Sequence, residues 1–219
     1  MKHAEKLKNF YKDGTSNHLE HNSFEQYWSM MLGPISTDKE MWEGKVALDF
    51  GCGKGRNVTN MLSLCDWKRV DGVDISEGNI EYCKNTYSDQ PSNWYSNSGE
   101  DLVDLKSNEY DFVMSYVVFQ HIPVYSIRKK LLQEILRVLK PGGLFSIQML
   151  FASPLTPISY YDDAPVDKCE RLDFQISSVD QLGEDLDNIG FIPYMYKVVP
   201  RPEHAGSENI YVWARKGND

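Results

Sequence analysis

Several features that mark common protein classes are missing from this sequence of 219 residues. Its four cysteines, Cys52, Cys65, Cys83 and Cys169, form no CxxC pair and have no zinc-ligand spacing with histidine. No apolar run approaches the roughly 20 residues that a membrane-spanning helix needs, and no targeting signal is readable. We therefore expect a cytoplasmic protein that holds no metal ion and does not enter a membrane.

An excess of positive charge is missing too. The chain has 23 Lys and Arg against 32 Asp and Glu, a formal net charge of -9, and its basic residues are scattered. This argues against a nucleic acid as partner. Hydrophobic residues make up 41% and charged residues 25%, which is the ordinary globular range, and the length suits one core with appended pieces.

From about Lys45 the chain alternates short apolar runs with longer stretches of helical period, which predicts β-α-β units and a mainly parallel sheet. Strands are expected near 45–50, 69–74, 93–96, 110–116 and 143–150, and helices near 55–65, 77–87 and 124–139. We expect Pro141-Gly142-Gly143 to end the last of these helices. Residues 1–44, which contain Phe10, Tyr11, Phe24, Tyr27 and Trp28, are expected to form a helical cap over one end of the sheet.

The pattern breaks at residues 152–177, which are rich in proline and aspartate and have no clear period. We predict a lid-like insertion there in the domain of residues 45–219, with a disordered surface insert as the alternative. A helix starting near Ser178 and capped by Gly190 should follow. Strands near 191–199 and 208–215 are expected to pair as a hairpin, adding an antiparallel strand at the sheet edge.

The segment Val46 to Asn57, VALDFGCGKGRN, carries the strongest functional signal, because it runs from a strand through a glycine turn into a helix. Its spacing is GxGxG, Arg56 replaces the third glycine of a dinucleotide fingerprint, and no Ser or Thr follows Lys54 as a phosphate loop requires. The carboxylate of Asp49, just before the loop, would repel a pyrophosphate and attract a cation. S-adenosylmethionine carries both a sulfonium and an ammonium.

A second acid, Asp74, closes the second strand about 20 residues beyond the glycines. An acid at that place pairs with ribose hydroxyls in sheets that bind nucleosides. Asp74 as the N-terminal cap of the next helix is an equally compatible interpretation.

With these motifs the chain resembles the class I S-adenosylmethionine-dependent methyltransferases from about residue 44 to 151. The resemblance implies a Rossmann-like α/β fold with helices on both faces of a seven-stranded, mainly parallel sheet of order 3-2-1-4-5-7-6, the last strand antiparallel. It also implies that Asp49, Gly51 and Gly53 lie along the methionine part of the donor, and that Asp74 and Ile75 hold the ribose and the adenine edge. In Ser98 to Leu102, Glu100 or Asp101 and the next backbone amide would meet the adenine. The other predicted donor contacts are Cys52, Arg56, Asn57, Gly99, Leu102 and Tyr116.

Methyl transfer from a sulfonium is an in-line displacement that positioning and exclusion of water can accelerate without a nucleophilic residue. If the acceptor is a hydroxyl, His121 after the fourth strand is our candidate base, and the alternative is that it anchors the turn or lines the donor pocket. Tyr116 and Gln120 are expected on the donor or the acceptor side. The side chains expected to line an acceptor pocket, with packing as the alternative, are Tyr11, Tyr27, Trp28, Tyr160 and Tyr161.

The predicted function is methyl transfer from S-adenosylmethionine to an oxygen or nitrogen of a small-molecule acceptor, leaving S-adenosylhomocysteine. A non-catalytic module that binds S-adenosylmethionine is one alternative, and an NAD-dependent oxidoreductase is another. Asp49 and the missing third glycine count against the oxidoreductase. The sequence indicates neither the acceptor's identity nor an oligomeric state.

Overall fold

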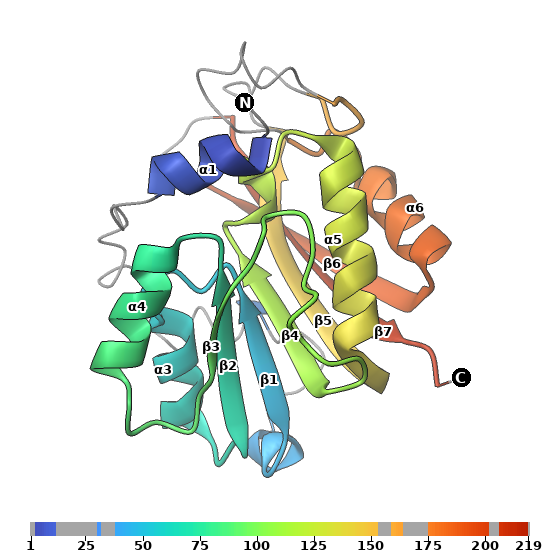
Figure 1. Cartoon of the computed structure of the whole chain (residues 1–219). Helices are drawn as coiled ribbons and strands as arrows, with labels where there is room; N and C mark the ends of the chain where they lie inside the picture. Colours follow the sequence, from blue (N-terminus) through green and yellow to red (C-terminus); the bar gives the residue numbers. More distant parts are fainter. Residues whose placement is uncertain are drawn as a thin grey trace.

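A seven-stranded sheet of order β3-β2-β1-β4-β5-β7-β6 runs through the protein in the computed structural model (Figure 1). The structure describes residues 3–11, 30–31, 38–152, 159–163, 175–201 and 206–218. The strands are β1 (Val46–Phe50), β2 (Arg69–Asp74), β3 (Trp94–Ser96), β4 (Tyr110–Tyr116), β5 (Leu139–Phe151), β6 (Phe191–Pro200) and β7 (Glu208–Lys216). Strands β1 to β5 run parallel to one another, and β7 is antiparallel to both of its neighbours, β5 and β6. The expected strand order and antiparallel last strand are confirmed.

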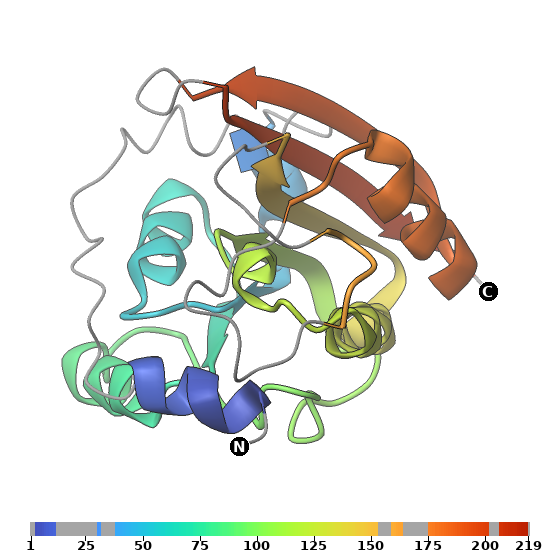
Figure 2. The same cartoon turned by 90° about the horizontal axis from the view of Figure 1, so that it is seen from above.

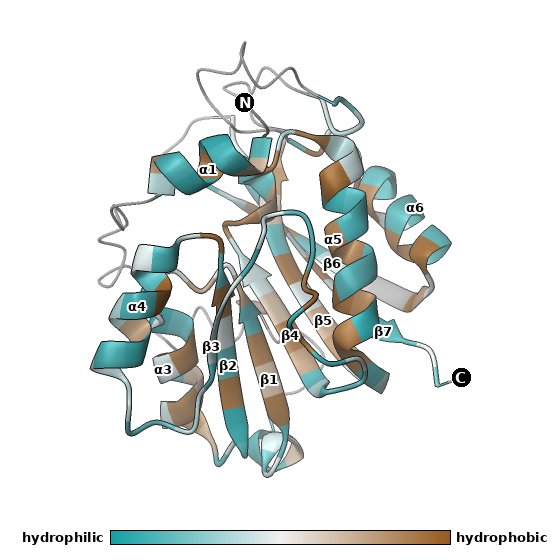
Figure 3. Ribbon diagram, viewed as in Figure 1, coloured by the Kyte–Doolittle hydropathy of each residue, from teal (hydrophilic) through white to brown (hydrophobic). Residues whose placement is uncertain are grey.

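Helices cover both faces of the sheet (Figures 1 and 2). The helices are α1 (His3–Tyr11), α3 (Arg56–Leu64), α4 (Glu77–Thr86), α5 (Tyr125–Val138) and α6 (Val179–Ile189), with short 3-10 turns η2 (Lys39–Trp42) and η3 (Phe119–His121). Helices α3 to α6 lie on the faces. Side chains of a strand alternate between the two faces, so Leu48 of β1 packs in the core under α5 and α6, whereas its neighbour Ala47 packs in the core under α3 and α4. The apolar colour of the central strands in Figure 3 reflects this burial on both sides.

Two details of the sequence prediction were wrong. The antiparallel strand is not at the edge, because β7 inserts between β5 and β6 and leaves β6 outermost. Helix α5 ends at Val138, and Pro141-Gly142-Gly143 lies within the first part of β5, which starts at Leu139. Proline restricts the residue before it to extended conformations, so the strand begins ahead of the glycines, and its pairing with β4 shifts register there.

Helix α1 lies across the end of the sheet where the parallel strands finish (Figure 1). It is fastened by a hydrogen bond of 2.8 Å from Ser76 Oγ to the carbonyl oxygen of Tyr11 and by the ion pair of Lys8 with Glu77 at 4.0 Å. Phe24, Tyr27 and Trp28 of the expected cap lie outside the described residues. No helix in the described part of the chain is long and apolar enough to cross a membrane.

Of the expected insertion at 152–177, the structure describes Ala152, residues 159–163 and residues 175–177. Tyr160 is buried and its hydroxyl donates to Asp185 Oδ2 of α6 at 2.6 Å, while its carbonyl oxygen accepts from the buried Arg128 of α5. The hydroxyl of Tyr125 donates to the other oxygen of Asp185 at 2.7 Å. Residues 159–163 are thus fastened to the two helices of one face.

Candidate active site

The glycine turn between β1 and α3 has a backbone that only glycine adopts easily. Gly51, Gly53 and Gly55 have φ values of +80°, +53° and +83°, in the left-handed region that L side chains disfavour. The amide of Gly51 donates to the carbonyl oxygen of Val73 in β2 at 2.8 Å. A Cβ atom at position 51 would lie 2.2 Å from Cγ2 of Val118. The turn therefore lies against the segment that follows β4, with no room for a side chain.

Asp74, at the end of β2, holds this turn from the other side. Its Oδ2 accepts a hydrogen bond of 2.8 Å from the amide of Gly53, and its Oδ1 accepts one of 2.8 Å from the amide of Ser76. The N-cap of α4 is Ser76, whose hydroxyl accepts from the amide of Asn79. Asp74 is therefore not the cap. Burial raises the pKa of Asp74, and the hydrogen bonds from Ser76 and Gly53 oppose that shift.

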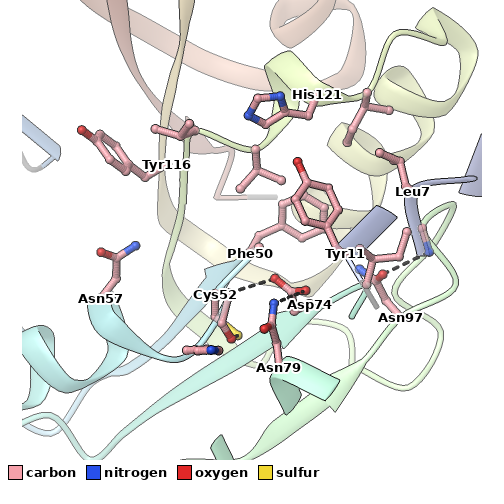
Figure 4. Close-up of a pocket in the computed structure, with 18 of the residues that line it drawn as sticks. Leu7, Tyr11, Phe50, Cys52, Asn57, Asp74, Asn79, Asn97, Tyr116 and His121 are labelled. Carbon is pink, nitrogen blue, oxygen red and sulfur yellow. Dashed lines mark hydrogen bonds between the residues drawn. The ribbon is translucent and has the colours of Figure 1, made fainter. Parts of the chain in front are cut away.

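A cavity of about 370 Å³ opens between these elements, at the carboxyl ends of the strands. Figure 4 shows Asp74, Asn79 and Asn97 on one side of it and Tyr116 and His121 across from them. Open α/β sheets bind ligands at this end, where the strand order reverses beside the first strand. The predicted residues that line it are Gly51, Cys52, Gly53, Arg56, Asn57, Asp74, Ile75, Gly99, Tyr116 and His121.

The third predicted segment differs from expectation, because Glu100, Asp101 and Leu102 are absent from the cavity lining. Oδ1 of Asp101 accepts from Ser98 Oγ at 2.8 Å and its Oδ2 pairs with Lys130 at 3.5 Å. The amide expected to meet the adenine was that of Asp101 or of Leu102. The first donates to Ser98 Oγ at 3.1 Å and the second to Oε2 of Glu134 at 3.0 Å. The structure brings Asn97 and Gly99 of this segment to the cavity in their place.

Sequence reasoning missed further residues that line the cavity. The polar ones are Lys54, Asn79 and Asn97, and the apolar ones are Leu7, Phe50, Val117, Val118, Ile122 and Leu131. Asn97 directly follows β3 and Asn79 lies in the first turn of α4. The rule that ligands bind beyond the carboxyl ends of parallel strands would have found Asn97. Leu7 comes from α1, within the segment that was expected to cap one end of the sheet, but no motif marked Leu7 itself.

Only some of the residues expected to line an acceptor pocket lie at the cavity. Tyr11 and Tyr116 line the cavity, and the guanidinium carbon of Arg56 lies 6.0 Å from the centre of the Tyr116 ring. Gln120 is buried outside the lining. Tyr160 and Tyr161 bond to Asp185 and Glu184 of α6 instead, whereas Tyr27 and Trp28 lie outside the described residues.

Asp49 is fully buried beneath the glycine turn and does not line the cavity. Neither of its carboxylate oxygens has a hydrogen-bond partner among the described residues. Desolvation raises the pKa of Asp49 to about 7, although Asn57 and Arg56 nearby act in the opposite direction. A buried carboxylate without a partner is costly, so a cationic group that came close would be attracted to it.

This burial predicts how stability changes with pH. Between the ordinary pKa of an aspartate and about 7, the folded protein keeps a proton that the unfolded chain has lost, so stability falls as pH rises. Asp49→Asn should therefore raise the free energy of unfolding at pH 8 by up to about 4 kcal/mol and have little effect at pH 4. Chemical denaturation at both pH values measures this, with the exposed Asp89→Asn as control. An equal effect at the two pH values would contradict the shifted pKa.

The comparisons with known proteins agree with this geometry. A family described as "Methyltransferase domain" matches residues 48–147. Thiocyanate methyltransferase 1 of Brassica oleracea is 32% identical over 121 residues, covering 54% of this chain and 50% of that protein. The chain spans half or less of the length of the first curated relatives that it matches.

Solved structures share the fold over nearly the whole chain. The 1,6-didemethyltoxoflavin-N1-methyltransferase of Burkholderia thailandensis, with bound S-adenosylhomocysteine, superimposes with a TM-score of 0.69 at 20% identity, covering 98% of this chain and 87% of that one. The cyclase SpnF gives a TM-score of 0.72 at 16% identity, covering 99% and 97%. At these identities the likeness concerns the fold, and one of the two proteins is named for a reaction other than methyl transfer.

Proposed function

Since the chain belongs to the class I S-adenosylmethionine-dependent methyltransferases, we propose that it transfers the methyl group of S-adenosylmethionine to an oxygen or nitrogen of a small-molecule acceptor. The observation that carries this proposal is the cavity at the carboxyl ends of β1, β2 and β4, which joins the glycine turn to Asp74. A turn of glycines with left-handed backbone conformations, and an acid at the end of β2, are what an adenosine ligand with a cationic tail requires there.

The donor would lie along this cavity with its ribose at Asp74 and its adenine beside Ile75, Asn97 and Gly99. Its methionine part would pass Gly51 and Gly53, where its ammonium group approaches the carboxylate of Asp49 beneath the turn. Cys52, Arg56, Asn57 and Tyr116 would complete this side of the cavity. Glu100, Asp101 and Leu102 stay predicted contacts of the adenine, although the carboxylate of Asp101 and the amide of Leu102 form hydrogen bonds elsewhere in the structure.

The donor supplies an activated methyl group, so the chain's own residues need to orient the acceptor and exclude water. Apolar side chains suited to this surround the cavity on the side of α1 and of the turn after β4, including Leu7, Val118 and Ile122. His121 stands among them, held by a hydrogen bond of 2.9 Å from its amide to the carbonyl oxygen of Val118. We propose that its imidazole accepts the acceptor's proton.

For His121→Gln we expect turnover at saturating donor to fall by about a hundredfold, the usual contribution of a general base. The dissociation constant of S-adenosylhomocysteine should stay within about threefold of wild type, because the change leaves Asp74 and the glycine turn intact. Single-turnover kinetics and calorimetry separate the two quantities. Equal losses in both would mean that His121 only lines the donor cavity.

The acceptor class is tested with donor carrying a labelled methyl group, mixed with cell extract separated into small-molecule, protein and RNA fractions. We expect label in the small-molecule fraction, supported by the net charge of -9 and the absence of a basic stripe. Label in protein or RNA would overturn the proposed acceptor. No transfer from a donor that binds would favour a non-catalytic module.

The free thiols of Cys52, Cys65 and Cys83 support a reducing, cytoplasmic setting.

A further inference from the structure

The residue that follows β4 has a backbone conformation that its side chain disfavours. Val117 has a φ of +59°, and a β-branched residue in the left-handed region is a genuine outlier. Val117 is among the residues that line the cavity. Such conformations persist only where the surrounding structure enforces them, and they cluster at functional sites.

One buried side chain forms a hydrogen bond with the backbone at this residue. The amide of Val117 donates to Oε1 of Gln148 in β5 at 2.9 Å, and Nε2 of Gln148 donates to Oδ1 of Asn209 in β7 at 2.9 Å. Gln148 is 1% exposed and lies opposite Tyr116 in the β4 to β5 pairing. Both ends of its carboxamide are therefore engaged, and the contact connects three neighbouring strands at the level of the cavity.

The turn at Val117 sets the position of the wall that faces the glycine turn. Val118 comes next and packs so closely over Gly51 that position 51 has no room for a Cβ atom. The carbonyl oxygen of Val118, the N-cap of η3, accepts a hydrogen bond from the amide of His121, the last residue of that turn. If residue 117 relaxed to an extended conformation, Val118 and His121 would leave these positions together.

We propose that Gln148 is a positioning residue of the donor site, which holds Val117 in the left-handed conformation and so keeps Val118 against the glycine turn. This inference rests on the proposed function of the cavity. Gln148 is not among the residues that line the cavity. We assign its effect on the donor to the hydrogen bond with the Val117 amide, and this separates it from a residue that contacts the ligand.

A double-mutant cycle with S-adenosylhomocysteine as the probe tests this coupling. Gln148→Met keeps the volume but removes the acceptor of the Val117 amide, and we expect affinity to fall about tenfold. Val117→Gly removes a side chain at the cavity, so the affinity of this variant is the reference for its own background, in which glycine adopts the left-handed conformation unaided. In the Val117→Gly background, Gln148→Met should cost less than about threefold. An equal cost of Gln148→Met in both backgrounds, or wild-type affinity in the single variant, would overturn the proposal.

Thermal unfolding of each variant checks that it is folded. If Gln148→Met does not fold, Asn209→Ala replaces it, because it leaves the Gln148 carboxamide in place and removes the acceptor of its Nε2 hydrogen bond. Its smaller loss of affinity should also shrink in the Val117→Gly background, and an unchanged loss would overturn the proposal. Wild-type protein that binds no S-adenosylhomocysteine would contradict the proposed function instead, which keeps the two failures distinguishable.

Discussion

Gly51→Ala is expected to abolish donor binding and to destabilise the fold. The left-handed conformation at φ +80° costs an alanine about 1–2 kcal/mol. Its Cβ atom would also meet Val118 at 2.2 Å, and relieving such overpacking costs about 1–3 kcal/mol more. We expect the free energy of unfolding to fall by about 2–5 kcal/mol, and no binding at donor concentrations about a hundredfold above the wild-type Kd.

Gly44→Ala is the matched control for this change. Gly44 also has a left-handed φ, of +69°, but nothing lies within 4 Å of the place of its Cβ atom. Backbone strain alone should lower its stability by about 1–2 kcal/mol and leave donor binding unchanged. Urea denaturation and calorimetry of both variants separate the effect of backbone strain from the effect of the contact with Val118. If both variants bound the donor equally well, the account of the Gly51 contact would be wrong.

Asp74→Ala should weaken donor binding by about 10²- to 10⁴-fold. The variant would lose the hydrogen bonds with two ribose hydroxyls, and hydrogen bonds to a charged group contribute about 1.5–3 kcal/mol each. The substitution also removes the acceptor of the Gly53 and Ser76 amides. The free energy of unfolding of the ligand-free protein should therefore fall by about 1–3 kcal/mol for each amide. The exposed Glu81→Ala controls for the change in charge.

A modified ligand separates direct contact from support of the glycine turn. Wild-type protein should bind S-adenosylhomocysteine more tightly than its 2′-deoxy analogue, whereas Asp74→Ala should bind the two alike. If the variant still discriminated between them as wild type does, Asp74 would act only through the Gly53 amide. The test uses titration calorimetry with both ligands on both proteins.

Local patterns predicted most of the fold. Apolar alternation and glycine punctuation gave the parallel strands, and Ser178 and Gly190 marked both ends of α6, where the structure has a capping box and a left-handed cap. The prediction failed where tertiary pairing decides. The hairpin pattern alone suggested an antiparallel edge strand, and only the order implied by the family resemblance placed β7 inside the sheet. The extended residues before Pro141 joined β5.

The site was predictable where a motif fixes the backbone, as at Gly51, Gly53 and Asp74. It was not predictable where contacts between distant residues decide the outcome. Glu134, 32 positions from Leu102, takes the amide that was assigned to adenine. Gln148 acts on a residue 31 positions away through its carboxamide, and no period or spacing in the sequence marks it.

The most direct test of the central claim is titration calorimetry of the purified protein with S-adenosylmethionine, with NADH titrated in parallel. The account predicts binding of S-adenosylmethionine in the micromolar range and none of NADH, because the buried carboxylate of Asp49 favours a cationic ligand and disfavours a pyrophosphate. No binding of S-adenosylmethionine, or a preference for NADH, would contradict it.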